Sequence, residues 1–218
     1  MLPGDLSELS VYLLAQSNDS FHAGKATMRR LRLLITIALA ILPGLGVEAH
    51  AQDSSVSSEY LIKAGFIYNF ANLVQWPSSA FAQPDSPIVL GIFGEDPFGS
   101  VLDRVLEGKK VNGRAFLVKR LRSAPDLKEC HIVFVSSSEL AHLAEAIHLV
   151  KGMPVLTIGE IPGFAKRGGI INLVLEDNKV HFEVNVEAAK EADLNISSRL
   201  LALARIVQET AADGRKTE

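Results

Sequence analysis

Three side chains that could bind a metal or exchange protons recur at three-residue steps in one predicted helix: His142, Glu145 and His148. Imidazole and carboxylate groups are ligands that Zn²⁺ accepts. Each three-residue step falls about 60° short of a full turn, so the outer two side chains would splay by roughly 120°. A metal site on a single helix prefers histidines four residues apart. We interpret all three as solvated helix positions and predict no metal site.

The serines that could act as nucleophiles all stand where a helix is expected to begin, where a hydroxyl serves as a cap. They are Ser136, Ser137, Ser138, Ser197 and Ser198. None lies in the G-x-S-x-G turn that exposes a nucleophile. His131 and His181 each stand alone beside an apolar run, as structural histidines do. We predict no catalytic residues and no enzyme; the alternative is an unrecognised hydrolase with a serine near Ser136.

Three glycines, Gly91, Gly94 and Gly99, fall at a predicted strand-to-helix turn. A helix N-terminus can hold an anion there. The spacing is not G-x-G-x-x-G, however, and no Lys-Ser/Thr pair follows to form a phosphate loop. We interpret the segment as a plain turn and predict no cofactor. The net charge of −3 gives no basic excess, so nucleic acid is not an expected partner.

A glycine-rich loop, residues 163–169, holds an aromatic side chain and two cations, which suit recognition. In one interpretation these side chains are exposed anchors; in the other, the glycines shape the turn and Phe164 covers the edge of the core. A predicted hairpin follows, and in its second arm, residues 179–186, apolar and polar residues alternate strictly, so the polar residues share one wet face. The predicted partner-binding residues from loop and strand are Phe164, Arg167, His181, Glu183 and Asn185.

Short apolar runs alternate with helical patterns along residues 59–207. Strands are expected at 88–93, 114–121, 131–135 and 154–158, with helices at 59–75, 97–107 and 139–150. A hairpin of residues 170–175 and 179–186 turns at Asp177-Asn178, which tolerate positive φ. A short helix should start near Glu187 and a last one run from Ser197 to Val207. This order predicts a single α/β domain: an open, mostly parallel sheet flanked by helices, with a C-terminal hairpin and helix.

The N-terminal part of the chain carries an export signal. A basic patch, residues 28–32, precedes ten apolar residues, 33–42, and the small-x-small triplet 49–51. Ten residues reach only about 15 Å as a helix, too short for about 30 Å of hydrocarbon. We predict a signal peptide at 28–51, cleaved between Ala51 and Gln52, with an uncleaved anchor as the alternative.

Other parts of the chain are expected to lie outside the fold or to be inert. Residues 1–27 are either a misassigned start, with Met28 as initiator, or an unstructured extension. Residues 208–218 form a polar, flexible tail. Cys130 is the single cysteine, so no internal disulfide can form, and we expect its thiol to be buried.

In order and spacing, several segments of the chain resemble the YfiR family of periplasmic regulatory proteins. The matching pieces are residues 68–71 (YNFA), Trp76-Pro77, 94–99, 130–136 (CHIVFVS), 163–165 (GFA), Gly168-Gly169, 180–185 (VHFEVN) and 196–204 (ISSRLLALA). The resemblance implies a periplasmic repressor that binds the periplasmic sensor domain of an inner-membrane diguanylate cyclase. It further implies lower cyclic di-GMP, less biofilm, an outer-membrane lipoprotein that sequesters the repressor, and a homodimer.

The rival hypothesis is a periplasmic small-ligand-binding protein. An open α/β sheet binds ligands at the carboxyl ends of its strands, here near residues 94–98 and Ser136. Transport binders of this kind usually have two lobes, whereas the predicted mature chain is sufficient for one.

Overall fold

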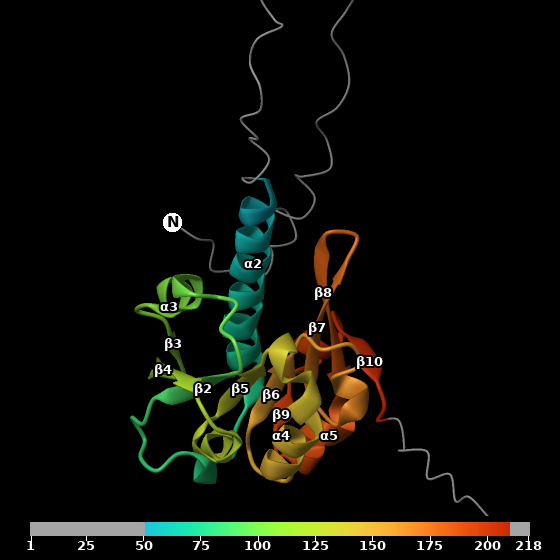
Figure 1. Ribbon diagram of the computed structural model, residues 1–218. Coiled ribbons are helices and arrows are strands. Elements are labelled where there is room, and N and C mark those ends of the chain that lie inside the picture. The colour runs from blue at the N-terminus through green and yellow to red at the C-terminus, as the bar shows by residue number, and fades with distance from the viewer. Residues whose placement is uncertain (1–50, 210–218) are drawn as a thin grey trace, which may run out of the picture. The chain divides into compact units, whose positions relative to one another are not determined.

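The computed structural model describes residues 51–209 of the chain. The predicted signal up to residue 50, the extension 1–27 and the last nine residues lie outside the described part. At its centre is an eight-stranded sheet in the order β10-β8-β7-β6-β5-β2-β4-β3 (Figure 1). Its strands are β2 Ile88–Phe93, β3 Lys110–Val111, β4 Arg114–Leu121, β5 Ile132–Val135, β6 Leu156–Gly159, β7 Ile171–Glu176, β8 Lys179–Asn185 and β10 Arg205–Val207.

Strands β4, β2, β5, β6 and β7 lie in this order and run parallel to one another. Strand β3 pairs antiparallel with β4 at one edge, β8 antiparallel with β7, and β10 parallel with β8 at the other edge. The predicted fold class, an open and mostly parallel α/β sheet with a C-terminal hairpin, is therefore confirmed.

Helices cover both faces of this sheet. Helices α2 Ala51–Leu73 and α3 Ser100–Leu106 pack on one face, whereas α4 Leu143–Val150 packs on the other. The remaining elements are α5 Val186–Glu191, α6 Ser198–Leu201 and four 3₁₀ turns, η1 Ser78–Ala80, η2 Ala124–Glu129, η3 Ser137–His142 and η4 Ala165–Arg167. A two-stranded ribbon of β1 Val74–Gln75 and β9 Asn195–Ile196 joins the end of α2 to the C-terminal region.

Helix α2 is the longest element and stands against the sheet beside the β7–β8 hairpin (Figure 1). Its buried side chains recur at three- and four-residue steps, as one apolar stripe requires. They are Ala64, Ile67, Phe70, Ala71 and, just past its end, Val74. The helix begins at Ala51 rather than at Glu59, so residues 52–58, which precede the predicted helix, form its first turns.

The last predicted helix is wrong beyond its first turn. Ser197 does cap a helix, since its hydroxyl accepts a hydrogen bond from Leu200 N, but α6 ends at Leu201. Residues 205–207 instead form β10, in register with β8. Ile206 and Val207 are β-branched and suit a strand, and pairing with β8 gives their backbone groups partners.

Helix α3 also begins later than predicted, at Ser100 instead of Pro97. The carboxylate Oδ1 of Asp96 accepts hydrogen bonds from Phe98 N at 2.8 Å and Gly99 N at 3.2 Å. Gly99 has φ of 52°, which interrupts the helical backbone just before Ser100.

The glycine-rich loop 163–169 closes over the core. Phe164 is 0 % exposed and its ring lies between two glycines. A Cβ on Gly169 would lie 2.7 Å from Phe164 Cζ, and one on Gly159 would lie 2.6 Å from Phe164 Cγ. The glycines thus make room for the ring, which corresponds to the core-edge interpretation of Phe164.

Replacing Gly169 with alanine should therefore destabilise the domain. We expect Gly169→Ala to lower the free energy of unfolding by about 1–3 kcal/mol, because the added methyl group displaces a buried ring. Gly65→Ala is the matched control: Gly65 lies in α2 with nothing within 4 Å of its added Cβ. That change should raise stability by about 0.5–1 kcal/mol through helix propensity. Urea unfolding measures both, and equal effects would contradict the packing of Phe164.

Candidate functional site

A row of neighbouring residues crosses the C-terminal half of the sheet, and their side chains point to the face away from α2. The strand registers place Gly159, Asn172, Glu183 and Arg205 side by side on β6, β7, β8 and β10. The opposite face of the same strands carries Leu173 and Phe182 into the α2 core. The hairpin is therefore apolar towards α2 and polar on its other side, as the alternating sequence predicted.

Charged groups on this polar face form a connected network. Both terminal nitrogens of Arg205 donate hydrogen bonds to the carboxylate of Glu176, each at 3.0 Å. Arg205 Nη1 also lies 3.8 Å from Glu183 Oε1, and Asn172 Nδ2 donates to Glu183 Oε2 at 3.0 Å. The guanidinium of Arg205 holds the pKa of Glu176 below its usual value. These contacts fix the orientation of each charged side chain, while Arg205 and Glu176 stay partly exposed to solvent.

Of the five predicted partner-binding residues, Arg167 and His181 are exposed. The side chain of Glu183 is 12 % exposed, and both its oxygens have partners, Asn172 and Arg205. The 3₁₀ turn η4, which ends at Arg167, is tied to the end of β8 because Asn185 Nδ2 donates to Ala165 O at 2.8 Å. The structure thus brings the loop and the hairpin face together. We call the polar strip the set Arg167, Glu176, His181, Glu183 and Arg205.

The prediction that Phe164 and Asn185 are exposed anchors is wrong. Phe164 fills the core between glycines, and Asn185 is 0 % exposed. The Asn185 carboxamide has both its groups engaged: Nδ2 with Ala165 O, and Oδ1 as the acceptor for Ala188 N at the start of α5. Asn185 is therefore a helix cap that also fixes η4, and alternation alone could not distinguish this role from a wet face.

A buried charge cluster that no local sequence pattern indicated lies between α2 and the end of β6. Lys63 Nζ lies 2.7 Å from Glu160 Oε2 and 2.5 Å from Glu59 Oε1. The side chains of Lys63 and Glu160 are only 4 % and 6 % exposed. Tyr60 donates to the same carboxylate at 3.2 Å. Burial first, and then the charges of Glu160 and Glu59, hold the pKa of Tyr60 well above its usual value.

This cluster fastens the middle of α2 to the sheet, so loss of its one cation should be costly. We expect Lys63→Met to lower the free energy of unfolding by about 3–5 kcal/mol, because it leaves two carboxylates without a cation in a buried site. Lys190→Met is the control, since Lys190 pairs with Glu187 on the exposed surface, where ion pairs contribute little. Comparable losses in thermal unfolding of the two variants would contradict a structural role for the buried cluster.

The crevice at the carboxyl ends of β2 and β5, where the small-ligand hypothesis placed its site, is filled by the protein itself. Ser138 Oγ accepts a hydrogen bond from Glu95 N at 3.0 Å, which joins the two loops. Phe98 is 3 % exposed and packs its ring against Tyr60 and Phe134. Arg120 bonds to Asp96 and Asp103 and holds the same loop from the side of β4.

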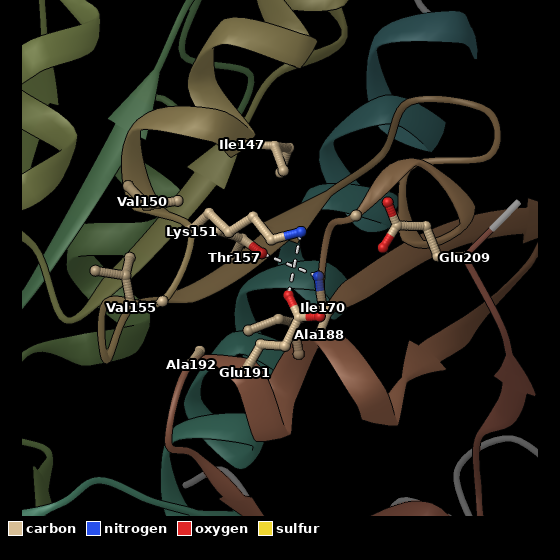
Figure 2. A pocket seen from close by; sticks show the side chains of 12 residues that line it. Ile147, Val150, Lys151, Val155, Thr157, Ile170, Ala188, Glu191, Ala192 and Glu209 are labelled. Carbon is tan, nitrogen blue, oxygen red and sulfur yellow. Dashed lines mark hydrogen bonds and ion pairs between the residues drawn. The ribbon is translucent and has the colours of Figure 1, made fainter. Parts of the chain in front are cut away.

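A small cavity lies between α4 and α5 (Figure 2). Lys151 and Glu191 meet across it at 3.3 Å, and Thr157 Oγ1 accepts a hydrogen bond from Ile170 N at 2.9 Å. The cavity holds about 40 Å³. That volume admits ordered water but is far below the roughly 300 Å³ of a small-molecule site.

A larger hollow of about 280 Å³ opens at the amino ends of β2 and β4. Its walls include Trp76, Phe81 and the guanidinium of Arg114, which lies 3.7 Å from the centre of the Phe81 ring. It lies at the opposite end of the strands from the predicted ligand crevice.

Two other side chains with reactive groups, His142 and Cys130, have protein partners or are buried. His142 is exposed and its Nδ1 lies 2.9 Å from Glu139 Oε2. Across residues 51–209 no three His, Cys, Asp or Glu side chains gather as metal ligands would. Cys130 is buried as predicted, and its burial raises the pKa of the thiol to about 11, so the thiol stays protonated.

Comparison with known proteins identifies the family to which this fold belongs. A model of the YfiR/HmsC-like family matches residues 60–205, which is nearly all of the described fold. The chain belongs to the YfiR/HmsC-like family. The resemblance predicted from the sequence is confirmed, and the family is regulatory rather than catalytic.

Comparisons with curated proteins and with solved structures gave no functional assignment. No curated protein matches the chain. A crystal structure of a conserved domain protein from Vibrio cholerae O1 biovar El Tor is similar at 10 % identity and a TM-score of 0.45, covering 67 % of this chain. This YfiR/HmsC-like chain spans 59 % of the length of that protein. Within residues 51–209, no helix has the length and apolar character that crossing a bilayer demands.

Proposed function

We propose that this YfiR/HmsC-like protein is a periplasmic regulator that binds and represses the sensor domain of an inner-membrane signalling protein. The receptor class we propose is a diguanylate cyclase, so that repression lowers cyclic di-GMP and limits biofilm formation. The observation that carries this proposal is the family match across residues 60–205. The export signal predicted at residues 28–51 supports the location, and cleavage after Ala51 would leave α2 at the start of the mature chain.

The polar strip is the surface that we propose meets the receptor. It combines exposed cations and a histidine with partly buried carboxylates on a rigid sheet, and arginine is a frequent anchor of protein interfaces. The hairpin is held by β6 on one side, by β10 on the other and by the α2 core. A surface already ordered before binding loses little conformational entropy on association.

Repression needs only a difference in affinity between two receptor conformations. If the strip binds the inactive receptor about 2–3 kcal/mol more tightly than the active one, it shifts the receptor equilibrium roughly 30- to 150-fold. No bond is made or broken in this mechanism, so it requires no catalytic residue. An outer-membrane lipoprotein that competes for the repressor, and a homodimer, remain predictions of the family resemblance.

Charge reversal on the strip should abolish repression without unfolding the domain. We expect Arg167→Glu combined with His181→Glu to weaken receptor binding at least about tenfold, since both changes remove exposed side chains of the strip and the first replaces a cation with an anion. The measurement is the cellular cyclic di-GMP level in the source bacterium, deleted for this protein and complemented with each variant. Deletion should raise the level, and the double variant should fail to restore it.

Arg104→Glu with Glu107→Lys is the matched control, because both side chains are exposed at the end of α3, which packs on the opposite face of the sheet from the strip. This variant should repress like the wild type. Full repression by the Arg167 and His181 variant, with its unfolding temperature unchanged, would show that the strip is not the contact surface. An unchanged cyclic di-GMP level on deletion would instead remove the cyclase from the proposal.

A further inference from the structure

The Arg114 guanidinium in the wall of the larger hollow has no carboxylate partner among residues 51–209. Its Nη1 donates hydrogen bonds to Gln83 O at 3.0 Å and to Ser86 O at 2.7 Å. Within the same described range, no acceptor bonds to Nε or Nη2. Asp85, the acid of the adjacent loop, is exposed and is not part of the wall. Nε and Nη2 lie side by side on a guanidinium, so a carboxylate from outside the protein can bridge them.

The rest of the wall is apolar or uncharged. Ile88 and Val111 are buried, and the half-buried rings of Trp76 and Phe81 add aromatic surface. The two remaining lining residues carry neutral carboxamides, Gln75 and Asn112. None of the described residues that line the hollow is acidic. The wall therefore offers an apolar surface beside the positive charge of Arg114.

Contacts within the protein hold this wall in place. Trp76 Nε1 donates a hydrogen bond to the backbone carbonyl of His131 at 3.2 Å. The Phe81 ring stacks on the His131 imidazole, with centroids 4.5 Å apart and an interplanar angle of 14°. The Arg114 guanidinium lies 3.7 Å from the centre of the Phe81 ring and is fixed by the two loop carbonyls. Because the wall is ordered before a ligand arrives, binding costs the protein little conformational entropy.

Volume and charge together define the class of ligand. The hollow encloses about 280 Å³, close to the roughly 300 Å³ at which small-molecule sites begin. That space suits one aromatic ring with a short side chain. The charge of Arg114 requires an anionic group, and a planar carboxylate matches the fork of a guanidinium. An ammonium group on the same ligand would lose its hydration without finding an acid among the described wall residues, so α-amino acids are disfavoured.

We propose that this hollow is a binding site for a small aromatic monocarboxylate, whose carboxylate pairs with Arg114 and whose ring packs beside Trp76. The site does not depend on the proposed receptor contact, because the polar strip lies on η4, β7, β8 and β10, whereas the hollow lies at β2 and β4. It also differs from the crevice at the carboxyl ends of β2 and β5, which the protein itself fills. Binding forms an ion pair and no covalent bond.

Trp76 is the single tryptophan of the chain, so its fluorescence reports directly on this hollow. The probe is hydrocinnamate, a phenyl ring on a short carboxylate chain, titrated into the purified protein at neutral pH. We expect saturable binding, by Trp76 emission and by calorimetry, with half-saturation at or below about 1 mM, as is usual for a ligand of this size. The absence of saturable binding by both methods up to about 10 mM would overturn the proposal.

Two analogues test the assigned chemistry. Hydrocinnamyl alcohol has the same ring and chain without the charge, and L-phenylalanine adds an ammonium group beside the carboxylate. Each should bind at least about tenfold more weakly than hydrocinnamate, because the first cannot form the ion pair with Arg114 and the second brings an unpaired cation. Equal binding of the alcohol would overturn the role of Arg114, and equal binding of the amino acid would overturn the assignment of a monocarboxylate.

Removal of the cation should have a specific effect. We expect Arg114→Gln to weaken hydrocinnamate binding at least about tenfold, since the charged hydrogen bonds to the carboxylate are lost. Arg122→Gln is the matched control, because Arg122 is exposed just past the opposite end of β4 and its loss changes the net charge equally. This control should bind hydrocinnamate like the wild type. An unchanged affinity in folded Arg114→Gln, or an equal loss in both variants, would overturn the proposal.

A second pair of variants leaves the loop contacts of Arg114 intact and decides the matter if Arg114→Gln does not fold. Gln75 lines the hollow and is exposed, so it accepts substitution. Gln75→Glu should weaken hydrocinnamate binding about threefold and Gln75→Lys should strengthen it about threefold, because a charge at this position repels or attracts the carboxylate. Identical affinities of these two variants would show that the ligand does not occupy the hollow.

Discussion

The packing of α2 against the β7–β8 hairpin is the contact on which the rest of this structure depends. Phe66 and Phe70 on the helix lie 5.6 Å and 5.1 Å, ring centroid to ring centroid, from Phe182 on β8. A two-stranded hairpin is marginally stable by itself, so one face must be buried for it to persist. Because the helix takes the apolar face, every alternate side chain is turned outward. The polar strip is thus a consequence of the core as much as of its own residues.

Periodicity and turn chemistry sufficed to predict most elements of this fold. The central strands follow apolar runs of the right length, and Asp177 and Asn178 do adopt positive φ, 50° and 58°, in the hairpin turn. Strand β10 was beyond such reasoning. Three residues after a helical turn become a strand only because β8 presents an open edge, and this information lies about 20 residues upstream.

The candidate site was predictable only in part, and for a physical reason. Alternation shows which residues leave the core face of a strand but not what covers the other face. Asn185 is buried by η4, whereas His181, on the same face nearer the hairpin tip, is exposed. Likewise, the glycines around Phe164 indicated a loop. Local sequence could not show that the Phe164 ring packs on Gly159, which belongs to β6. Lys63 and Glu160 are 97 residues apart, and nothing local marks them as a pair.

The ends of the strands differ in how open they are. The carboxyl ends of β2 and β5 are closed by Ser138 and Glu95, and the cavity between α4 and α5 is only large enough for water. The hollow of about 280 Å³ lies at the opposite, amino ends of β2 and β4, beside Trp76. Ion pairs and caps hold the loops that flank the sheet, including the buried Lys63 cluster and the Asn185 cap.

The central claim is that the polar strip touches a membrane sensor, and photo-crosslinking in living cells tests it most directly. A photoreactive amino acid would be placed at position 181 on the strip and, in a second strain, at position 104 on α3, on the opposite face of the sheet. The account predicts that position 181 crosslinks to an inner-membrane protein with a periplasmic sensor domain and that position 104 does not. Crosslinking from position 104 alone, or capture of no membrane protein from position 181, would contradict it.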